Sequence, residues 1–453
     1  MKNKPITKKS MKQDQNYIET INFLYSLQRF GIKLGLQNIE RLLKLFQNPE
    51  RKFISIHVAG TNGKGSTSSF IASILKANGY KVGLYTSPHL VDFTERIRIN
   101  GIPISREKVV EYVKILQDEI VNLKATFFEA TTAIAFKYFA DEKVDFAVIE
   151  VGLGGRLDST NVIKPAASVI TTISYDHMDV LGDTIEKIAL EKAGIIKDET
   201  PCITGCDDEK ALNIIKKIAE EKKSKLIIAD QISNTNVKAV EENSLKFDLK
   251  TEKNFYPDLV AGVSGRFQVK NSQLAILVYE LLADLGFLSF DKKSVYEGLL
   301  NVRNFSGLRG RLETINLSNS PKNPKIIIDV AHNYPAITQL VSELEIFKRK
   351  KLLLLFAVMR DKEYEKMIRK LSEITDFAVA TQPKIARALD AKTICEIFQR
   401  NGVDSIYIYD SDKAFEFILN KAEEDDLILI TGSNYLIGEI IAHIEKRKIE
   451  CLI

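Results

Sequence analysis

An apolar run over residues 53–59 leads directly into a glycine-rich loop with a single lysine, Gly60-Thr61-Asn62-Gly63-Lys64-Gly65-Ser66. A helical pattern over residues 67–78 follows the loop. Glycines allow backbone N–H groups to turn toward an anion, Lys64 supplies a positive charge, and the helix N-terminus adds its partial positive charge. This order of strand, loop and helix indicates an α/β unit with a phosphate site, and a nucleoside triphosphate is the expected ligand.

The loop departs from the usual P-loop pattern at two positions. Gly65 stands where Ser or Thr normally follows the lysine, and Val58 stands where the first glycine is expected. The alternative interpretation is a glycine-rich turn with a solvated lysine. The flanking strand and helix favour the phosphate site, because both lie where such a loop needs them.

Strand-like runs alternate with amphipathic stretches over almost the whole chain, which is typical of α/β domains with largely parallel sheets. Because 453 residues exceed what one hydrophobic core usually serves, we expect two domains. We predict a flexible tail over residues 1–12, an ATP-binding P-loop domain over 13–306 and a smaller, Rossmann-like α/β domain over 307–453. The glycine- and arginine-rich stretch 304–311 marks the boundary between the domains.

The hydrophobic pattern also predicts the individual elements of both domains. Residues 226–262 differ from the rest, because short β-like pieces alternate there with polar turns, as in an antiparallel edge or flap. The other expected strands are 53–59, 81–85, 145–151, 167–173, 200–204, 325–330, 351–357, 376–380, 406–409 and 427–431. The expected helices are 67–78, 106–122, 127–140, 183–196, 208–223, 270–286, 291–301, 335–349, 362–373, 391–401, 411–422 and 435–447.

Composition excludes several classes of protein. The net charge of +4, from 64 Lys and Arg against 60 Asp and Glu, is too small to indicate a nucleic-acid partner. No apolar run approaches 18 residues, and the basic N-terminus lacks the apolar segment of a signal peptide. The four cysteines lack zinc-type spacing and are too few for a disulfide scaffold. We therefore expect a cytoplasmic protein with no membrane partner, and a monomer, since no heptad run demands assembly.

Four of the five histidines, His57, His89, His177 and His332, lie in or beside loops that follow predicted strands. Ligands of open α/β sheets bind beyond the carboxyl ends of the strands. His177 follows one apolar strand and Glu150 ends another, so with a hydroxyl from the phosphate region they could form a magnesium site. The alternative for each histidine is a packing or hydrogen-bonding role.

Two charged residues near the domain boundary are placed to reach a cleft between the domains. Arg311 precedes the second domain, and Asp329 ends its first clear strand. Lys192, by contrast, lies in a helical stretch where nothing distinguishes it from Lys187 or Lys197. From the residues alone it is a solvated helix lysine.

Several ordered motifs extend from about residue 30 to the stretch 432–438. They are Gly60 to Ser66, Thr86-Ser87-Pro88-His89-Leu90, Glu95 to Gly101, Glu150 to Asn161, Asp176-His177, Glu191 to Lys197, Gly265-Arg266-Phe267-Gln268 and Asp329 to Asn333. As a set they resemble the folylpolyglutamate synthase and dihydrofolate synthase family, which belongs to the ATP-dependent Mur ligases. The resemblance implies that 13–306 is a Mur-ligase-like ATPase domain and that 307–453 is the glutamate-ligase domain.

The resemblance also implies an activity. In this family ATP phosphorylates a substrate carboxylate, the amine of L-glutamate attacks the acyl phosphate, and an amide forms with release of ADP and phosphate. The acceptor is dihydropteroate, a folate, or both. Positioning and charge neutralisation do most of the catalytic work in such a reaction.

The resemblance further assigns roles to individual residues. The catalytic residues would be Lys64, His332 and Lys192, the last one carbamylated. ATP would be bound by Asn62, Gly63, Lys64, Gly65, Ser66, Asn271, Arg311 and Asp329, and two magnesium ions by Ser87, Glu150 and His177. His332 and Asn333 would lie near the γ-phosphate and the incoming glutamate. The pterin acceptor would contact Leu34, Gly35, Leu36, Phe128, Thr131, Leu157, Asp158 and Ser159.

Two motifs differ from the family pattern. The hinge reads Leu308-Arg309-Gly310-Arg311 instead of Pro-Gly-Arg, which makes Arg309 a rival to Arg311, and Val330 and Tyr334 alter the Asp329 motif. Two alternative functions remain at this point. One is a Mur-type ligase that joins an amino acid to a cell-wall nucleotide, and the other is a non-catalytic protein that closes on ATP.

Overall fold

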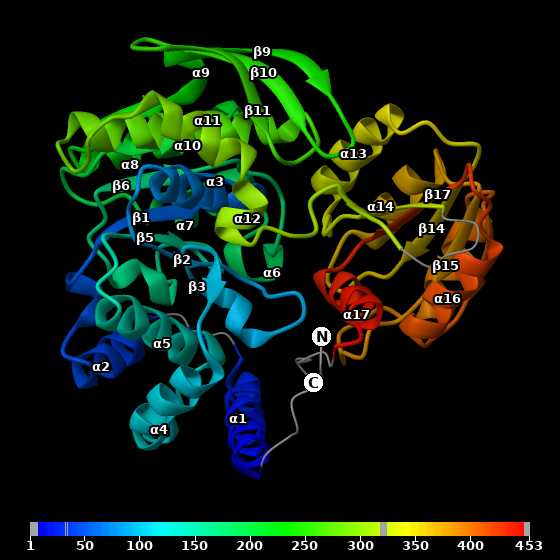
Figure 1. The fold of residues 1–453 in the computed structure, drawn as a ribbon, viewed down its shortest axis with the longest axis horizontal. Helices are drawn as coiled ribbons and strands as arrows, with labels where there is room; N and C mark the ends of the chain where they lie inside the picture. The colour runs from blue at the N-terminus through cyan, green and yellow to red at the C-terminus, as the bar shows by residue number, and fades with distance from the viewer. Residues whose placement is uncertain (1–7, 32, 34, 318–323, 448–453) are drawn as a thin grey trace.

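A computed structural model describes residues 8–31, 33, 35–317 and 324–447, and its strands form three separate sheets (Figure 1). An eight-stranded and a three-stranded sheet are built from the chain up to residue 261, and a six-stranded sheet from residue 313 onward. The N-terminal part lies on one side of Figure 1 and the C-terminal part on the other. The α/β fold class with two sheet-centred parts is thereby confirmed.

The eight-stranded sheet places the phosphate loop at its centre. Its order is β4-β3-β2-β5-β1-β6-β7-β8, and β1 pairs in parallel with β5 and β6. These central strands are buried along almost their whole length because helices cover both faces of the sheet. The strands are β1 (Ile54–Ala59), β2 (Val82–Tyr85), β3 (Ile97–Ile99), β4 (Ile102–Pro103), β5 (Phe146–Glu150), β6 (Ala167–Ile170), β7 (Cys202–Thr204) and β8 (Leu226–Ile228).

Helices from distant parts of the chain cover this sheet. One face packs against α3 (Lys64–Ala77), α10 (Phe267–Asp284), α11 (Lys292–Leu300) and α12 (Val302–Ser306). The other face packs against α2 (Gln37–Leu45), α4 (Arg106–Leu123) and α5 (Phe127–Asp141), with α1 (Lys8–Ser26) beside them. A separate cluster holds α6 (Met178–Leu181), α7 (Ile185–Ala193) and α8 (Glu209–Glu221). The shorter helices are α9 (Ala229–Ile232), η1 (Leu27–Phe30), η2 (Pro49–Arg51), η3 (Phe93–Arg96) and η4 (Ser159–Val162).

The three-stranded sheet is antiparallel and lies above α10 in Figure 1. Its strands are β9 (Ser233–Val240), β10 (Leu245–Thr251) and β11 (Phe255–Ala261). The alternate residues Leu245, Phe247 and Leu249 of β10 are fully buried in the same core as α10. Alternation of this kind is expected of a sheet that covers the core with one face only.

The second domain is a six-stranded sheet in the order β12-β13-β17-β14-β15-β16, in which only β12 pairs antiparallel. One face packs against α13 (Tyr334–Glu343), η5 (Leu344–Ile346), α14 (Tyr364–Ser372) and α15 (Ala391–Arg400), and the other against α16 (Ser411–Lys421) and α17 (Asn434–Ile444). The strands are β12 (Glu313–Ile315), β13 (Lys325–Ile328), β14 (Leu352–Phe356), β15 (Phe377–Ala380), β16 (Asp404–Tyr407) and β17 (Leu427–Thr431).

The structure differs from the sequence-based expectations in several places, and helices α2 and α12 were not expected at all. Helix α1 begins at Lys8, so the predicted tail is partly helical, and residues 1–7 lie outside the described residues. Strands β3, β4 and β12 were not expected, because edge strands of two or three residues are too short to show a period. β8 extends the main sheet in parallel, whereas the sequence placed it in the antiparallel segment.

Among the described residues, no helix combines the length and the apolar character that crossing a bilayer requires.

A close contact between α11 and α3 gives a test of the packing. A Cβ added at Gly298 would lie 2.6 Å from the Cα of Ile74, which is backbone and cannot rotate away. Overpacking of this kind costs about 1–3 kcal/mol, and we expect Gly298→Ala to lie at the upper end of that range. The gain in helix propensity offsets about 1 kcal/mol of it. Urea denaturation should show a net loss of stability.

The matched control is Glu297→Ala, because Glu297 is the exposed neighbour on the same helix. Its unfolding free energy should stay within about 0.5 kcal/mol of the original protein. Equal midpoints for the two variants would contradict the close packing of α11 on α3.

Candidate active site

The phosphate loop is held in shape by contacts that leave no room for side chains at two of its glycines. At Gly60, with φ +148°, a Cβ would collide with the Thr171 hydroxyl, which donates to the carbonyl of Asn62 at 2.7 Å. At Gly63, with φ +86°, a Cβ would collide with the side-chain amide of Asn271 on α10. Positive φ values favour glycine in any case. Both glycines therefore lie where the loop backbone comes closest to the side chains of Thr171 and Asn271.

Charged groups converge where the loop enters α3. Glu150, at the end of β5, accepts a hydrogen bond from the Ser87 N–H at 2.9 Å. A Cβ at Gly65 would lie 3.6 Å from both the Glu150 carboxylate and the Arg311 guanidinium. The Lys64 ammonium donates to the carbonyls of Gly60 and Thr61 at 3.0 Å each. The loop thus lies between one buried carboxylate and two cations.

Burial governs the ionisation of Glu150. It raises the pKa of this carboxyl above its usual range, although Lys64, the Ser87 N–H and Arg311 all act in the opposite direction. A carboxylate in such a place is costly without positive charge nearby. Glu150 therefore depends on these positive groups to carry its negative charge.

Lys192 on α7 is buried against the loop, with 5% of its surface exposed. Its ammonium donates to the Gly60 carbonyl at 2.9 Å. Burial, and secondly the charge of Lys64, lower the pKa of Lys192 from 10.5 to about 7. Near neutral pH a large share of this amine carries no proton and is nucleophilic. The structure thus separates Lys192 from Lys187, which is exposed and paired with Asp183.

The hinge brings the second domain to the same place and separates the two rival arginines. Arg311 is half-buried beside Asp329 and Glu150, and desolvation lowers its pKa. Arg309 is instead bound by Glu313 at 2.6 Å and by Glu445 at 3.0 Å. Only Arg311 faces the phosphate loop.

Asp329 is a structural acceptor in this arrangement. It accepts the N–H groups of Leu312 at 2.8 Å and Ala331 at 2.8 Å. Burial raises the pKa of Asp329, and Arg311 opposes the shift.

His332 lies three residues after Asp329. The Nδ1 of His332 donates to the Val330 carbonyl at 2.9 Å, which leaves Nε2 as an acceptor. Burial and Lys362 lower the pKa of His332 to about 4, so the imidazole is neutral at physiological pH.

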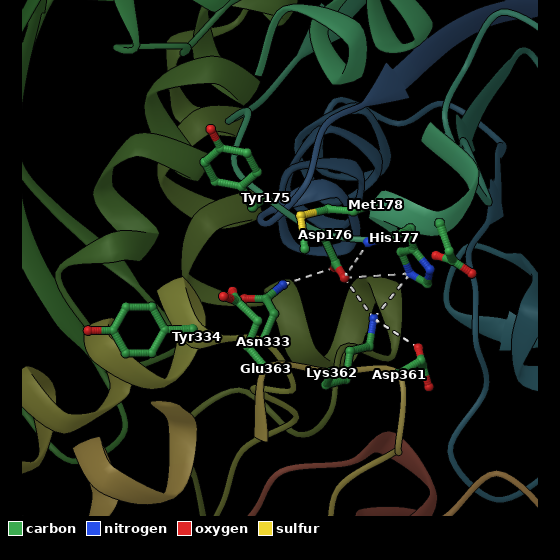
Figure 2. A pocket seen from close by; sticks show the side chains of 10 residues that line it. Tyr175, Asp176, His177, Met178, Asn333, Tyr334, Asp361, Lys362 and Glu363 are labelled. Carbon is green, nitrogen blue, oxygen red and sulfur yellow. Dashed lines mark hydrogen bonds and ion pairs between the residues drawn. The ribbon is translucent and has the colours of Figure 1, made fainter. Parts of the chain in front are cut away.

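A polar cluster joins the two domains, and Figure 2 shows its members Asp176, His177, Asn333 and Lys362. Asn333 exchanges two hydrogen bonds with Asn62 of the loop, at 3.0 and 3.2 Å, and donates to Asp176 at 3.1 Å. Lys362 pairs with Asp176 at 2.7 Å and lies 3.4 Å from Nε2 of His177. Asp176, His177, Asn333 and Lys362 border a cavity of about 290 Å³. The cavity therefore belongs to both domains.

Burial tends to raise the pKa of Asp176, but Lys362 and then His177 outweigh it and hold this pKa well below its usual range. Asp176 is therefore a permanent anion that holds Lys362. The sequence analysis did not assign a role to either residue. Lys362 follows the carboxyl end of β14, so the rule that ligands lie beyond strand ends could have singled it out.

The predicted acceptor residues fall into two groups. Leu36 and Phe128 pack in one hydrophobic cluster, where Phe128 lies 5.9 Å from the Tyr85 ring. The side chains of Thr131 and Asp158 instead form hydrogen bonds with nearby residues of their own segments. The Thr131 hydroxyl donates to the Phe127 carbonyl at 2.7 Å. Gly35 and Leu157 are half-buried and Ser159 is buried, whereas Leu34 lies outside the described residues.

Asp158 uses both carboxylate oxygens to hold its own loop. One oxygen accepts the N–H and the hydroxyl of Thr160 at 3.0 and 2.5 Å, and the other accepts the Leu153 N–H at 2.9 Å. His57, at the centre of β1, bonds the same Thr160 hydroxyl at 2.8 Å. Of the four loop histidines of the sequence analysis, His57 is the one enclosed in the core, and burial lowers its pKa to about 3.

Comparison with known proteins agrees with the two-part structure. Residues 58–279 match the Mur ligase middle domain, and residues 310–434 match the glutamate ligase domain of Mur ligases. The dihydrofolate synthase/folylpolyglutamate synthase of Bacillus subtilis is 36% identical over 436 residues, covering 94% of this chain and 98% of its own length. The dihydrofolate synthetase of Saccharomyces cerevisiae is 33% identical over 433 residues, covering 91% and 98%.

Solved structures show the same similarity over nearly the full length. The folylpolyglutamate synthase of Thermotoga maritima superimposes with a TM-score of 0.83 at 33% identity, covering 96% of this chain and 98% of that one. E. coli FolC in complex with DHPP and ADP gives a TM-score of 0.84 at 26% identity, covering 95% and 98%. The chain therefore belongs to the dihydrofolate synthase/folylpolyglutamate synthase family of Mur ligases, and it is an ATP-dependent carboxylate–amine ligase.

Proposed function

We propose that this protein adds L-glutamate to dihydropteroate, to the γ-carboxylate of (tetrahydro)folate, or to both. An acyl phosphate is the intermediate, and ADP and phosphate are released. The observation that carries the proposal is the meeting of the phosphate loop with Arg311 and Asn333 of the second domain. E. coli FolC binds DHPP and ADP in a closely similar fold, which supports the same substrates here.

The chain's own residues divide the work between them. The loop N–H groups and Lys64 hold the triphosphate, and Arg311 neutralises charge on the phosphoryl group as it is transferred. Neutral His332 keeps Nε2 as an acceptor, which is suited to accept a hydrogen bond from the incoming amine and so to orient it. Closure of the domains brings these groups together, since the loop, Arg311 and His332 come from both sides of the hinge.

Magnesium fits part of the predicted ligand set. Glu150 is a buried carboxylate next to Ser87, and Mg²⁺ prefers such oxygen ligands together with water. Among the described residues, no cluster of three or more His, Cys, Asp or Glu is present, and His177 contacts Asp176 and Lys362. Glu150 and Ser87 would hold the ion, which would neutralise phosphate charge.

Carbamylation of Lys192 fits its environment. Carbamate formation requires an unprotonated amine, and the lowered pKa of Lys192 supplies one near neutral pH. The added carboxylate would place a second negative group near Lys64, whose charge is felt at Lys192. The modification therefore matches a buried lysine beside a cation.

The alternative functions have less support. The similar full-length proteins are named for folate ligases, not for cell-wall ligases. A protein that only closed on ATP would not need the neutral His332 or the buried Lys192, and both are present at the cleft. The monomeric state and the cytoplasmic location remain part of the proposal.

A coupled assay of ADP release tests the ligase proposal. With magnesium, ATP and glutamate, either dihydropteroate or tetrahydrofolate should stimulate ADP release, and mass spectrometry should show a product one glutamate heavier. We expect Lys64→Ala to lower kcat by about 10²-fold or more, because the transferred phosphate loses its cation. The proposal fails if neither acceptor stimulates ADP release by the unaltered protein.

Labelling with ¹³C-bicarbonate tests the carbamate. A carbamate carbon signal should appear in the NMR spectrum of the unaltered protein and disappear in Lys192→Arg, while Lys187→Arg retains it. Lys192→Ala should lose most activity, and bicarbonate should not restore it. A retained label in Lys192→Arg would place the carbamate elsewhere, and full turnover by Lys192→Ala would exclude its role.

The pH dependence of stability provides an independent check on Lys192. The pKa of Lys192 is about 7 in the folded state and near 10.5 in the unfolded state. The free-energy cost of burying its ammonium is therefore fully present below pH 7. This cost disappears as the pH rises to about 10.5. In CO₂-free buffer, Lys192→Met should therefore raise the urea midpoint most at pH 6 and little at pH 10. A gain that is independent of pH would contradict the lowered pKa.

A further inference from the structure

Arg96 is a buried cation, and its side chain binds a histidine instead of a carboxylate. It ends η3 just before β3, and 4% of its surface is exposed. Its Nε donates to Nδ1 of His89 at 2.8 Å, and no ion pair joins Arg96 to a carboxylate within the part of the chain that is described. Buried arginine is rare unless it is paired. The two terminal amino groups of its guanidinium are therefore available to an anion.

The other buried or half-buried arginines of this region differ from Arg96. Arg98, two residues further along, donates to the carbonyls of Glu95 and Gly101 at 3.1 Å each. Arg303 pairs with Glu313 at 3.4 Å. Arg96 alone among these three is directed toward aromatic rings and a histidine.

Aromatic groups surround this cation. The guanidinium carbon lies 5.0 Å from the centre of the Phe127 ring, within the range of a cation–π contact. The His89 ring is stacked with Tyr25 at 6.4 Å and 19°. Because the Nε of Arg96 can only donate, Nδ1 of His89 accepts and carries no proton in this contact. With the His89 imidazole neutral, the pair of Arg96 and His89 carries the single positive charge of Arg96.

The position of Arg96 points to the substrate. The Thr86 N–H donates to the Arg96 carbonyl at 3.0 Å, immediately before Ser87, which binds Glu150. Glu150 and Arg96 act on each other's charge, and Lys64 and Arg311 act on Glu150 as well. Three cations therefore face one carboxylate. Such an excess of positive charge favours anions in addition to phosphate.

We propose that Arg96, oriented by His89, is a carboxylate-binding subsite for the acceptor. Its fork of N–H groups suits a carboxylate, and the rings beside it suit the aromatic part of a pteroate. The inference rests on the proposed function for the identity of the acceptor. The carboxylate is either the one that becomes activated or, in a folate, the second carboxylate of its terminal glutamate.

Equilibrium binding tests this subsite without requiring turnover. Calorimetry without ATP would compare dihydropteroate, tetrahydrofolate and a dihydropterin that lacks a carboxyl group, on the full chain and on Arg96→Met. We expect Arg96→Met to raise the Kd of carboxylate-bearing ligands about tenfold or more, which is typical for loss of a charged hydrogen bond. The Kd of the carboxyl-free pterin should change little.

The two acceptors distinguish the source of the carboxylate. Weaker binding of tetrahydrofolate alone assigns the subsite to the glutamate carboxylate, and weaker binding of both assigns it to the carboxylate that reacts. Unchanged binding of both, or equal weakening of the carboxyl-free pterin, would overturn the proposal. Ligation by the original protein with unchanged binding by Arg96→Met would overturn this subsite alone, whereas binding without ligation would overturn only the proposed function.

A stability measurement separates binding from a structural role. Removal of an unpaired buried charge should leave the urea midpoint of Arg96→Met unchanged or higher. The matched control, Arg98→Met, leaves two carbonyls without their donor, so its midpoint should fall while acceptor binding stays intact. A lower midpoint for Arg96→Met, or failure of that variant to fold, would contradict the subsite. Arg96→Lys keeps the charge and should retain part of the affinity.

Discussion

The structure depends on the close approach of polar supports to the backbone of the phosphate loop. Thr171 can approach the loop because Gly60 has no side chain, and Lys192 lies close enough to bind the Gly60 carbonyl. This approach requires Lys192 to be buried at the end of the sheet, where its pKa falls to about 7. One backbone contact thus determines the loop shape and the ionisation of a lysine that would otherwise be solvated.

The second domain completes the site by polar contacts. Asn333 meets Asn62 on the loop itself, and Lys362 binds the permanent anion Asp176. Apolar packing also contributes, since Leu90 of the first domain packs with the core of the second, and Gly438 of α17 leaves no space for a side chain against the Leu90 carbonyl. Because the contacts that join the domains include residues of the phosphate loop, closure and assembly of the site are one event.

Local patterns in the sequence predicted much of this arrangement. The strand, loop and helix at residues 53–78 and the alternation of elements identified the α/β class, because each signal lies within one short segment. The pairing of Asp176 with Lys362 joins residues 186 positions apart and has no local pattern. Arg309 and Arg311 were equivalent in sequence, and only the positions of Glu313 and Glu445 separate them. The burial of Lys192 also depends on tertiary packing.

The buried charges of this site lower the stability of the fold, and their signs indicate which ligands would offset that loss. Glu150 and Lys192 both have pKa values shifted toward the neutral form by burial, and Arg96 has no ion pair with a carboxylate among the described residues. A fold selected for stability alone would replace such groups with apolar ones. Since positive groups outnumber carboxylates around Glu150, anionic ligands would offset the excess of positive charge. Binding of the phosphates and of the acceptor carboxylate should therefore stabilise the closed protein, so that substrates complete the electrostatic balance of the site.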